Sequence, residues 1–208
     1  MRGIRRSLGT APRKKASATA ERIIAMALST GEDLKGLRDC ALLLIGFAGA
    51  FRRSELVALD LEDLEECELG FKVTIRHSKT DQEGAGQTIA ILRGSVACPV
   101  VALKAWLEAS GISTGPVFRS VKKGGVVAGR LPAQSVADIV KTYAERVGLD
   151  ASLFAGHSMR SGFLTSAAKR GASIFKMMDQ SRHRSVETLR GYVRDAEIFK
   201  EHAGAGLL

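Results

Sequence analysis

The chain has 208 residues and a mass of 22.2 kDa, and its 45% hydrophobic and 25% charged residues exclude a wholly disordered protein. Lysine and arginine number 31 against 22 acidic residues. The resulting net charge of +9 favours a polyanionic partner, with nucleic acid ahead of an anionic membrane surface.

Apolar runs and cysteines exclude two further classes of protein. The longest apolar run, residues 40–51, is too short for a membrane span of about 20 residues. Cys40, Cys67 and Cys98 are widely spaced and form no Cys-x-x-Cys pair, so we expect neither a disulfide framework nor a zinc site. The sequence therefore predicts a protein without a metal, located in a reducing cytoplasm.

The N-terminal third predicts a basic arm followed by helices. Residues 1–19 mix arginine and lysine with glycine and proline, which is typical of a flexible arm or interdomain linker. Thr19 can cap a first helix. Residues 37–48 are apolar on nearly every side and predict a buried central helix, which Gly49 ends. We expect Ser54 to cap the next helix.

The middle of the chain predicts a small sheet. Residues 60–68 are rich in acids and predict a solvated surface, which would repel DNA. The segments 71–75 and 87–92 carry alternating β-branched residues on either side of a turn rich in glycine, as in a β-hairpin. A helix is expected over 99–109, with Trp106 in the core.

The rest of the chain again predicts helices, and no internal repeat is present. They are expected over residues 133–147, 158–169, 173–180 and 185–193. The fold class that follows is mainly α with one small antiparallel β-sheet (α+β).

Two residues that suit chemistry on a phosphate are spaced three apart. His157 and Arg160 share one face of a helical turn. Histidine exchanges protons near neutral pH, and arginine can clamp two phosphate oxygens. Because this spacing is also common among surface residues, the pair alone does not define a site.

A basic cluster precedes a tyrosine near the C-terminal end. His183 lies between two arginines, and Tyr192 follows nine residues later. We hypothesise that nearby cations lower the pKa of Tyr192 from its ordinary value of about 10. A tyrosinate can form a covalent intermediate. The alternative is a tyrosine half-buried on an amphipathic helix, and composition does not separate the two.

Two further basic residues lie at positions that suit a site. Arg52 falls at the corner after the central helix, where a side chain is well held, although Arg53 beside it is also a candidate. Lys79 follows the first strand of the hairpin, which can bring its ammonium group to a substrate. Most lysines in hairpins are only solvated.

Taken together, these segments resemble the tyrosine recombinase (phage integrase) family. Residues 49–59, GAFRRSELVAL, resemble the family's first arginine box. Residues 157–163, HSMRSGF, resemble its His-x-x-Arg box, and residues 183–185 with Tyr192 resemble the box that ends in the nucleophilic tyrosine. Lys79 falls in the hairpin where the family keeps its catalytic lysine.

The resemblance implies a fold, an activity and a set of roles. It implies the catalytic domain shared with type IB topoisomerases, and a site-specific DNA recombinase or integrase that works through a 3′-phosphotyrosyl intermediate without metal or nucleotide cofactor. The implied partner is double-stranded DNA, on which the full-length protein forms a tetramer. The implied roles are Tyr192 as nucleophile, Lys79 as general acid, His157 as acid–base, Arg52, Arg160 and His183 as phosphate clamp, and Glu55 as a supporting residue.

This sequence departs from the family pattern at two places and in length. Ser161 stands where the family often has His or Lys, and Ser181-Arg182 where it has Leu-Gly, and we expect neither departure to carry chemistry. Family members usually have an N-terminal core-binding domain. The resemblance thus predicts that this domain is absent, that residues 20–208 form the catalytic domain, and that residues 1–19 form the arm or linker.

Two alternatives remain open at this point. A type IB topoisomerase uses the same residues but relaxes supercoils without exchanging partners. A noncatalytic DNA-binding regulator is the second alternative, although such a protein has no need of Tyr192. The role among phage integration, transposon mobility, integron-like exchange and chromosome-dimer resolution stays open.

Overall fold

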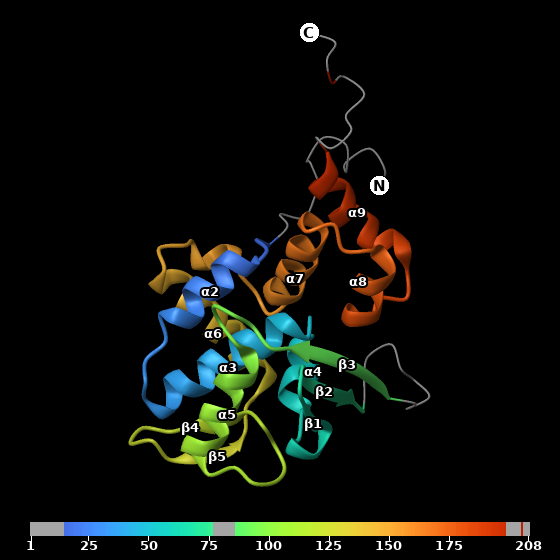
Figure 1. The fold of residues 1–208 in the computed structure, drawn as a ribbon. Helices are drawn as coiled ribbons and strands as arrows, with labels where there is room; N and C mark the ends of the chain where they lie inside the picture. The colour runs from blue at the N-terminus through green and yellow to red at the C-terminus, as the bar shows by residue number, and fades with distance from the viewer. Residues whose placement is uncertain (1–14, 77–85, 199–204, 206–208) are drawn as a thin grey trace, which may run out of the picture.

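The computed structural model describes residues 15–76, 86–198 and 205, and over these it is mainly helical with small antiparallel sheets (Figure 1). The predicted fold class is therefore confirmed. The helices are α2 (Ala20–Leu28), α3 (Leu34–Ala48), α4 (Arg53–Ala58), α5 (Pro99–Ser110), α6 (Ala133–Arg146), α7 (Ser158–Lys169), α8 (Ile174–Ser181) and α9 (Val186–Glu197). The strands are β1 (Leu64–Cys67), β2 (Gly70–Ile75), β3 (Gln87–Leu92), β4 (Arg119–Val121) and β5 (Val127–Arg130).

Helix α3 is the centre of the main core. Its apolar residues are buried on nearly every side, and it packs against α2, α5 and α7. It begins before the predicted residue because Asp33 caps it, with a carboxylate oxygen 2.8 Å from the amide nitrogen of Gly36. Trp106 of α5 is fully buried in the same core, as predicted. The core thus supplies a rigid base for the corner that follows α3.

The corner between α3 and α4 has a strained backbone. Gly49 ends α3, and Ala50 then has a φ of +45°, a region that residues with a side chain seldom occupy. The prediction that Ser54 caps α4 is wrong. Arg52 is the N-cap, because Glu55 reaches back and accepts a hydrogen bond of 3.0 Å from the Arg52 amide. The corner therefore holds Arg52 by its backbone.

The predicted hairpin is confirmed and forms part of a three-stranded antiparallel sheet in the order β1-β2-β3. Strand β1 was not expected, because it lies within the acidic stretch. Basic residues neutralise that stretch: Arg76 lies 2.5 Å from the buried carboxylate of Asp63, and Lys72 lies 2.9 Å from Glu65. The stretch therefore forms a sheet edge in which Asp63 is buried, whereas the other acids stay at least partly exposed to solvent, as predicted.

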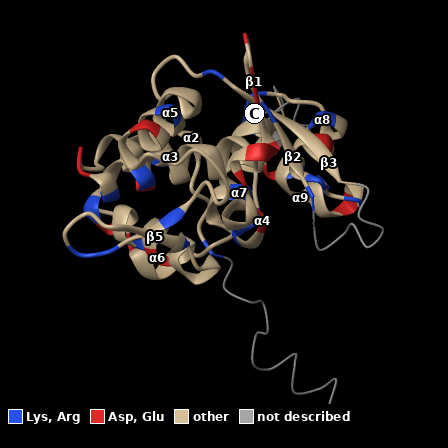
Figure 2. Ribbon diagram, turned by 90° about the horizontal axis from the view of Figure 1, so that it is seen from below, with Lys and Arg blue, Asp and Glu red and all other residues tan. Residues whose placement is uncertain are grey.

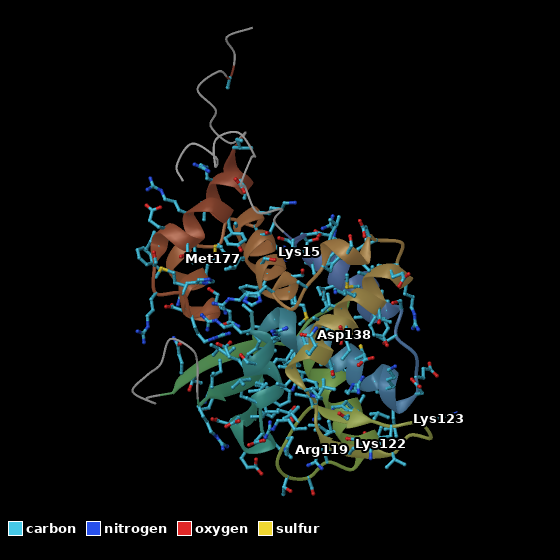
Figure 3. The ribbon with its side chains drawn as sticks, turned by 180° about the vertical axis from the view of Figure 1, so that it is seen from behind. Lys15, Arg119, Lys122, Lys123, Asp138 and Met177 are labelled. Atoms are coloured by element: carbon cyan, nitrogen blue, oxygen red, sulfur yellow. The ribbon has the colours of Figure 1, made fainter. Side chains whose placement is uncertain are left out.

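Helices α7, α8 and α9 share a second, smaller hydrophobic cluster, distinct from the main core. Its buried members are Leu164, Ala168, Met177 and Leu189. Met177 of α8 is labelled in Figure 3, at the end of the molecule opposite the β4–β5 turn. Tyr192 packs against this cluster as a partly buried residue. The position of α9 therefore depends on a few contacts within this cluster.

Residues 15–18 are docked along α7, although the sequence predicted a flexible arm there. The Ala16 amide donates to the Leu153 carbonyl at 2.7 Å, and the Ala18 amide donates to the Ser158 carbonyl at 2.9 Å. Gly162 permits this close approach, since a Cβ at that position would meet the Ala18 carbonyl oxygen at 1.8 Å. The rest of the predicted arm lies outside the described residues.

Substitution by alanine is expected to change stability in opposite directions at two glycines in helices. Gly162→Ala is expected to lower the free energy of unfolding by about 1–3 kcal/mol, because the added methyl group displaces the docked segment. Gly191→Ala in α9 is expected to raise it by about 0.5–1 kcal/mol, because no atom lies within 4 Å and alanine favours the helix. Urea unfolding measures both. An unchanged stability for Gly162→Ala would show that the segment is not tightly docked.

Candidate active site

Arg160 joins the corner after α3 to the segment between α8 and α9. Its Nη1 donates to the Ala50 carbonyl at 2.7 Å, and its Nη2 lies 3.2 Å from His183 Nδ1. Burial, followed by the cations Arg52 and Arg182, lowers the pKa of Arg160 to about 9, so the group stays charged at neutral pH. The structure therefore brings together Arg160 and His183 as the sequence predicted.

Glu55 lies between two guanidinium groups. One carboxylate oxygen contacts Arg52 Nη1, and the other accepts from Arg182 Nη2 at 2.8 Å. Burial raises the pKa of Glu55, but Arg182 and Arg52 outweigh burial and hold that pKa below its ordinary value. Arg52 keeps 17% of its side chain exposed, whereas Glu55 is buried. A buried carboxylate thus holds the partly accessible Arg52 in place.

Sequence reasoning gave no role to Arg182, which is buried at the centre of this cluster. Its guanidinium reaches Glu55 and the carbonyls of the corner after α3. The available signal was the presence of an arginine directly before His183, where the resembling family has glycine. Arg52, Arg160 and Arg182 together outnumber the one carboxylate of Glu55, so the cluster carries an excess of positive charge that is mostly shielded from solvent.

His183 is neutral at physiological pH. Burial, followed by Arg160, Arg52 and Arg182, lowers its pKa to about 4. A guanidinium has donors only, so we assign Nδ1 beside Arg160 as an acceptor and the proton to Nε2. Ser181 Oγ lies 2.7 Å from Nδ1 and 2.6 Å from the Met177 carbonyl, and in this tautomer its hydroxyl donates to Nδ1 and fixes the ring. The Nε2–H group is then available as a hydrogen-bond donor.

Tyr192 and His157 line the same groove, between residues 15–17, α7 and α9, with a volume of about 470 Å³. The hypothesis that cations acidify Tyr192 is wrong. Burial raises its pKa, and the attraction of Arg160 only partly opposes this. Burial, followed by Arg160, lowers the pKa of His157, so its ring is neutral at pH 7. The tyrosine therefore needs a base, and a neutral imidazole shares its groove.

Lys79 lies outside the described residues, but the strands that flank it are placed. Gln180 Nε2 lies 2.8 Å from both the Ala48 carbonyl and the Ala90 carbonyl of β3. Gln180 thus connects the end of α3, the hairpin and α8, and Figure 1 shows β3 beside α8. Two other lysines, Lys122 and Lys123, lie in the β4–β5 turn, away from α8 and the hairpin (Figure 3).

Basic charge alone does not locate this site. Lys and Arg lie on α7, α8 and α9 and also around the β4–β5 hairpin (Figure 2). A larger cavity of about 760 Å³, lined by α3 and α6, contains none of the candidate residues. Over the described residues, no group of three His, Cys, Asp or Glu side chains could hold a metal ion. No described helix is long and apolar enough to cross a membrane.

The boxes, the cluster and the mainly helical fold define a class of protein. The chain belongs to the phage integrase family, whose model matches residues 16–197. It is 44% identical over 207 residues to an integrase/recombinase xerD homolog of Selenomonas ruminantium, covering 98% of this chain and 61% of that protein. It is 30% identical over 164 residues to the tyrosine recombinase XerC of Pelotomaculum thermopropionicum, covering 76% and 47%.

Solved structures show the same fold. The XerH site-specific recombinase bound to a palindromic difH substrate, in a post-cleavage complex, matches with a TM-score of 0.69 at 15% identity. The match covers 88% of this chain and 51% of that chain. The chain therefore has the fold of a tyrosine recombinase catalytic domain, and it spans about half to three fifths of the length of these relatives.

Proposed function

We propose that residues 20–208 are the catalytic domain of a site-specific DNA recombinase, with residues 1–19 as its arm or interdomain linker. The observation that carries the proposal is the excess of guanidinium charge on the buried Arg160 and Arg182 and the partly accessible Arg52, beside the neutral His183. Such a cluster is incomplete without an anion. A phosphate of the DNA backbone supplies that negative charge and matches the geometry of guanidinium groups.

The first step cleaves one DNA strand. The Tyr192 oxygen attacks the scissile phosphorus, a phosphorus–oxygen bond forms, and the bond to the 5′-oxygen breaks. His157 takes the tyrosine proton, as its neutral state and its place in the same groove allow. Arg52, Arg160 and the Nε2–H of His183 stabilise the charge on the nonbridging oxygens.

The second step rejoins the strand. In the cleavage step Lys79 has given its proton to the departing 5′-oxygen and is left neutral, and the 3′-phosphotyrosyl bond keeps the energy of the broken phosphodiester. A 5′-hydroxyl from a second DNA strand then attacks the phosphorus and gives its proton to Lys79. The bond between phosphorus and the Tyr192 oxygen breaks, and Tyr192 regains its proton from His157. Atoms and protons balance without a metal or nucleotide cofactor, because the guanidinium groups carry the charge stabilisation.

The partner in this proposal is double-stranded DNA, which places the protein in the cytoplasm with the chromosome. The XerH structure, with the same fold, holds a difH substrate after cleavage. Exchange of strands between two sites needs four cleaving subunits, so we propose that the longer protein works as a tetramer on DNA.

Capture of a covalent complex tests the proposal. The 208-residue chain is incubated with nicked duplexes randomised around the nick, so that cleavage releases a short fragment and traps the protein. A protein–DNA adduct that survives denaturation is expected. No adduct from any duplex would point to a noncatalytic DNA-binding protein.

Recombination and relaxation are separated with the duplex that the adduct selects. Two plasmids carrying that sequence should exchange strands when the longer protein is used. A supercoiled plasmid without the sequence should stay supercoiled. Relaxation of that plasmid without exchange would instead support a type IB topoisomerase.

A further inference from the structure

Arg182 combines a strained backbone with complete burial. Its φ is +59°, in the left-handed region that glycine adopts at least cost, and its side chain is only 1% exposed. Its guanidinium lies over the Phe51 ring, with Cζ 5.2 Å from the ring centre. The guanidinium donates to the Gly49 carbonyl at 2.9 Å, the Gln180 carbonyl at 2.6 Å, the Ala50 carbonyl at 3.0 Å and Glu55 Oε2 at 2.8 Å.

Two of these acceptors are shared with residues of the proposed phosphate clamp. The Ala50 carbonyl accepts both from Arg182 and from Arg160, at 3.0 and 2.7 Å. The Glu55 carboxylate accepts both from Arg182 and from Arg52. Arg182 therefore contacts both acceptors that hold the clamp arginines, the Ala50 carbonyl and the Glu55 carboxylate. It also directly precedes His183 in the chain.

We infer that Arg182 is a positioning residue that orients Arg52 through Glu55 and Arg160 through the Ala50 carbonyl, so that both guanidinium groups face one phosphate. The inference rests on the proposed function, and it adds a residue for which the sequence gave no role. The strained φ supports it, because a purely structural turn at this position is made at lower cost by glycine.

Charge offers a way to separate positioning from simple packing. His183 faces Arg160 of α7, Arg52 at the start of α4, its neighbour Arg182 and the carboxylate of Glu55. Arg160 also faces Tyr192 of α9. Removal of Arg182 takes one cation from this set, so the pKa of His183 should rise from about 4. The pKa of Glu55 should rise as well, because burial is then less opposed.

Three substitutions at position 182 are compared with a control. Arg182→Met removes the charge and keeps the strained backbone, Arg182→Gly removes both, and Arg182→Lys keeps the charge. The control is Arg38→Met, because Arg38 is equally buried and paired with Asp39, but lies away from this cluster. Arg182→Gly keeps the test decisive if the methionine variant does not fold, since glycine adopts the required φ without strain.

The first measurement is the rate of adduct formation on the duplex selected from the nicked pool, in a single turnover. Arg182→Met and Arg182→Gly should slow it by about 10- to 100-fold at unchanged DNA affinity, because misplacement by an ångström has effects of this size. Arg182→Lys should recover part of the rate, and Arg38→Met should cleave like the parent chain. Equal slowing by Arg38→Met, or an unchanged rate without Arg182, would overturn the inference.

The second measurement needs no DNA. The His183 ring is titrated by NMR, with its signal assigned from His183→Gln. Its midpoint should rise in the methionine and glycine variants and stay near that of the parent in Arg182→Lys. If the parent chain forms no adduct, the proposed function fails, and this titration alone tests whether Arg182 acts on the cluster. An unchanged midpoint in all variants would then overturn the role of Arg182 in this cluster.

Discussion

Tyr192→Phe is expected to reduce the protein–DNA adduct below detection while DNA binding persists. In the proposed mechanism the phenolic oxygen is the atom that bonds to phosphorus, so its removal takes away the nucleophile. The fold should hold, because the tyrosine is only partly buried and packs through its ring on the cluster of α7, α8 and α9. Denaturing gel electrophoresis after incubation with the nicked pool measures the adduct.

Tyr143→Phe is the matched control for this variant, because Tyr143 is the chain's second tyrosine. It lies on α6, outside the boxes, and its hydroxyl donates to buried Asp39 Oδ2 at 3.1 Å. The control should lose about 1 kcal/mol of stability with that hydrogen bond and still form the adduct. An adduct that persists in Tyr192→Phe would show that another residue is the nucleophile.

The second large effect separates the general acid from the phosphate clamp. Lys79→Ala should cleave normal DNA slower by on the order of a hundredfold or more, because a 5′-alkoxide leaves poorly without a proton. With sulfur in place of the bridging 5′-oxygen, the rate should return close to that of the parent chain, since a thiol has a pKa of about 8.5. Arg160→Ala should lose about 10²–10³ in rate on both substrates, because sulfur does not replace the charge it stabilises.

Single-turnover cleavage of the two substrates measures these rates. Equal slowing of Lys79→Ala on both would mean that Lys79 is not the acid. Three other lysines are unsuitable substitutes in the structure. Lys72 is paired with Glu65 on the exposed side of the sheet, and Lys122 and Lys123 lie at the far end of the molecule (Figure 3). A bound water would then be the remaining source of the proton.

Much of the fold followed from the sequence because local signals agreed with the packing. The apolar run became α3, and the alternating segments became β2 and β3, which pair antiparallel as expected for a hairpin. The predictions failed where long-range partners decide. Strand β1 was missed because it pairs with β2 through the backbone, while its acids Glu65 and Glu66 stay exposed and pair with Lys72 and Arg93, which are not adjacent to them in the chain.

The candidate site followed from the spacing of the boxes, but its electrostatics did not. The sequence placed cations near Tyr192 and suggested a lowered pKa, whereas burial dominates and raises it. The burial of Tyr192 depends on how α9 packs, and the spacing of residues along the chain does not reveal that packing. Arg182 was missed for a related reason, since its importance comes from sharing acceptors with Arg52 and Arg160 across more than a hundred residues of sequence.

The small cluster under α9 has a consequence for the observed rate of cleavage. Of the residues on α9, Leu189 is fully buried, and burial of one such side chain contributes about 1.5–3 kcal/mol. Tyr192, Val193 and Ala196 pack on the same cluster only as partly buried residues, so α9 should detach more readily than the whole domain unfolds, which needs about 5–15 kcal/mol. In the proposed mechanism cleavage needs the tyrosine on a docked helix, so the observed rate is the intrinsic chemical rate multiplied by the docked fraction. Substitutions that loosen the cluster are therefore expected to slow cleavage without touching the reacting atoms.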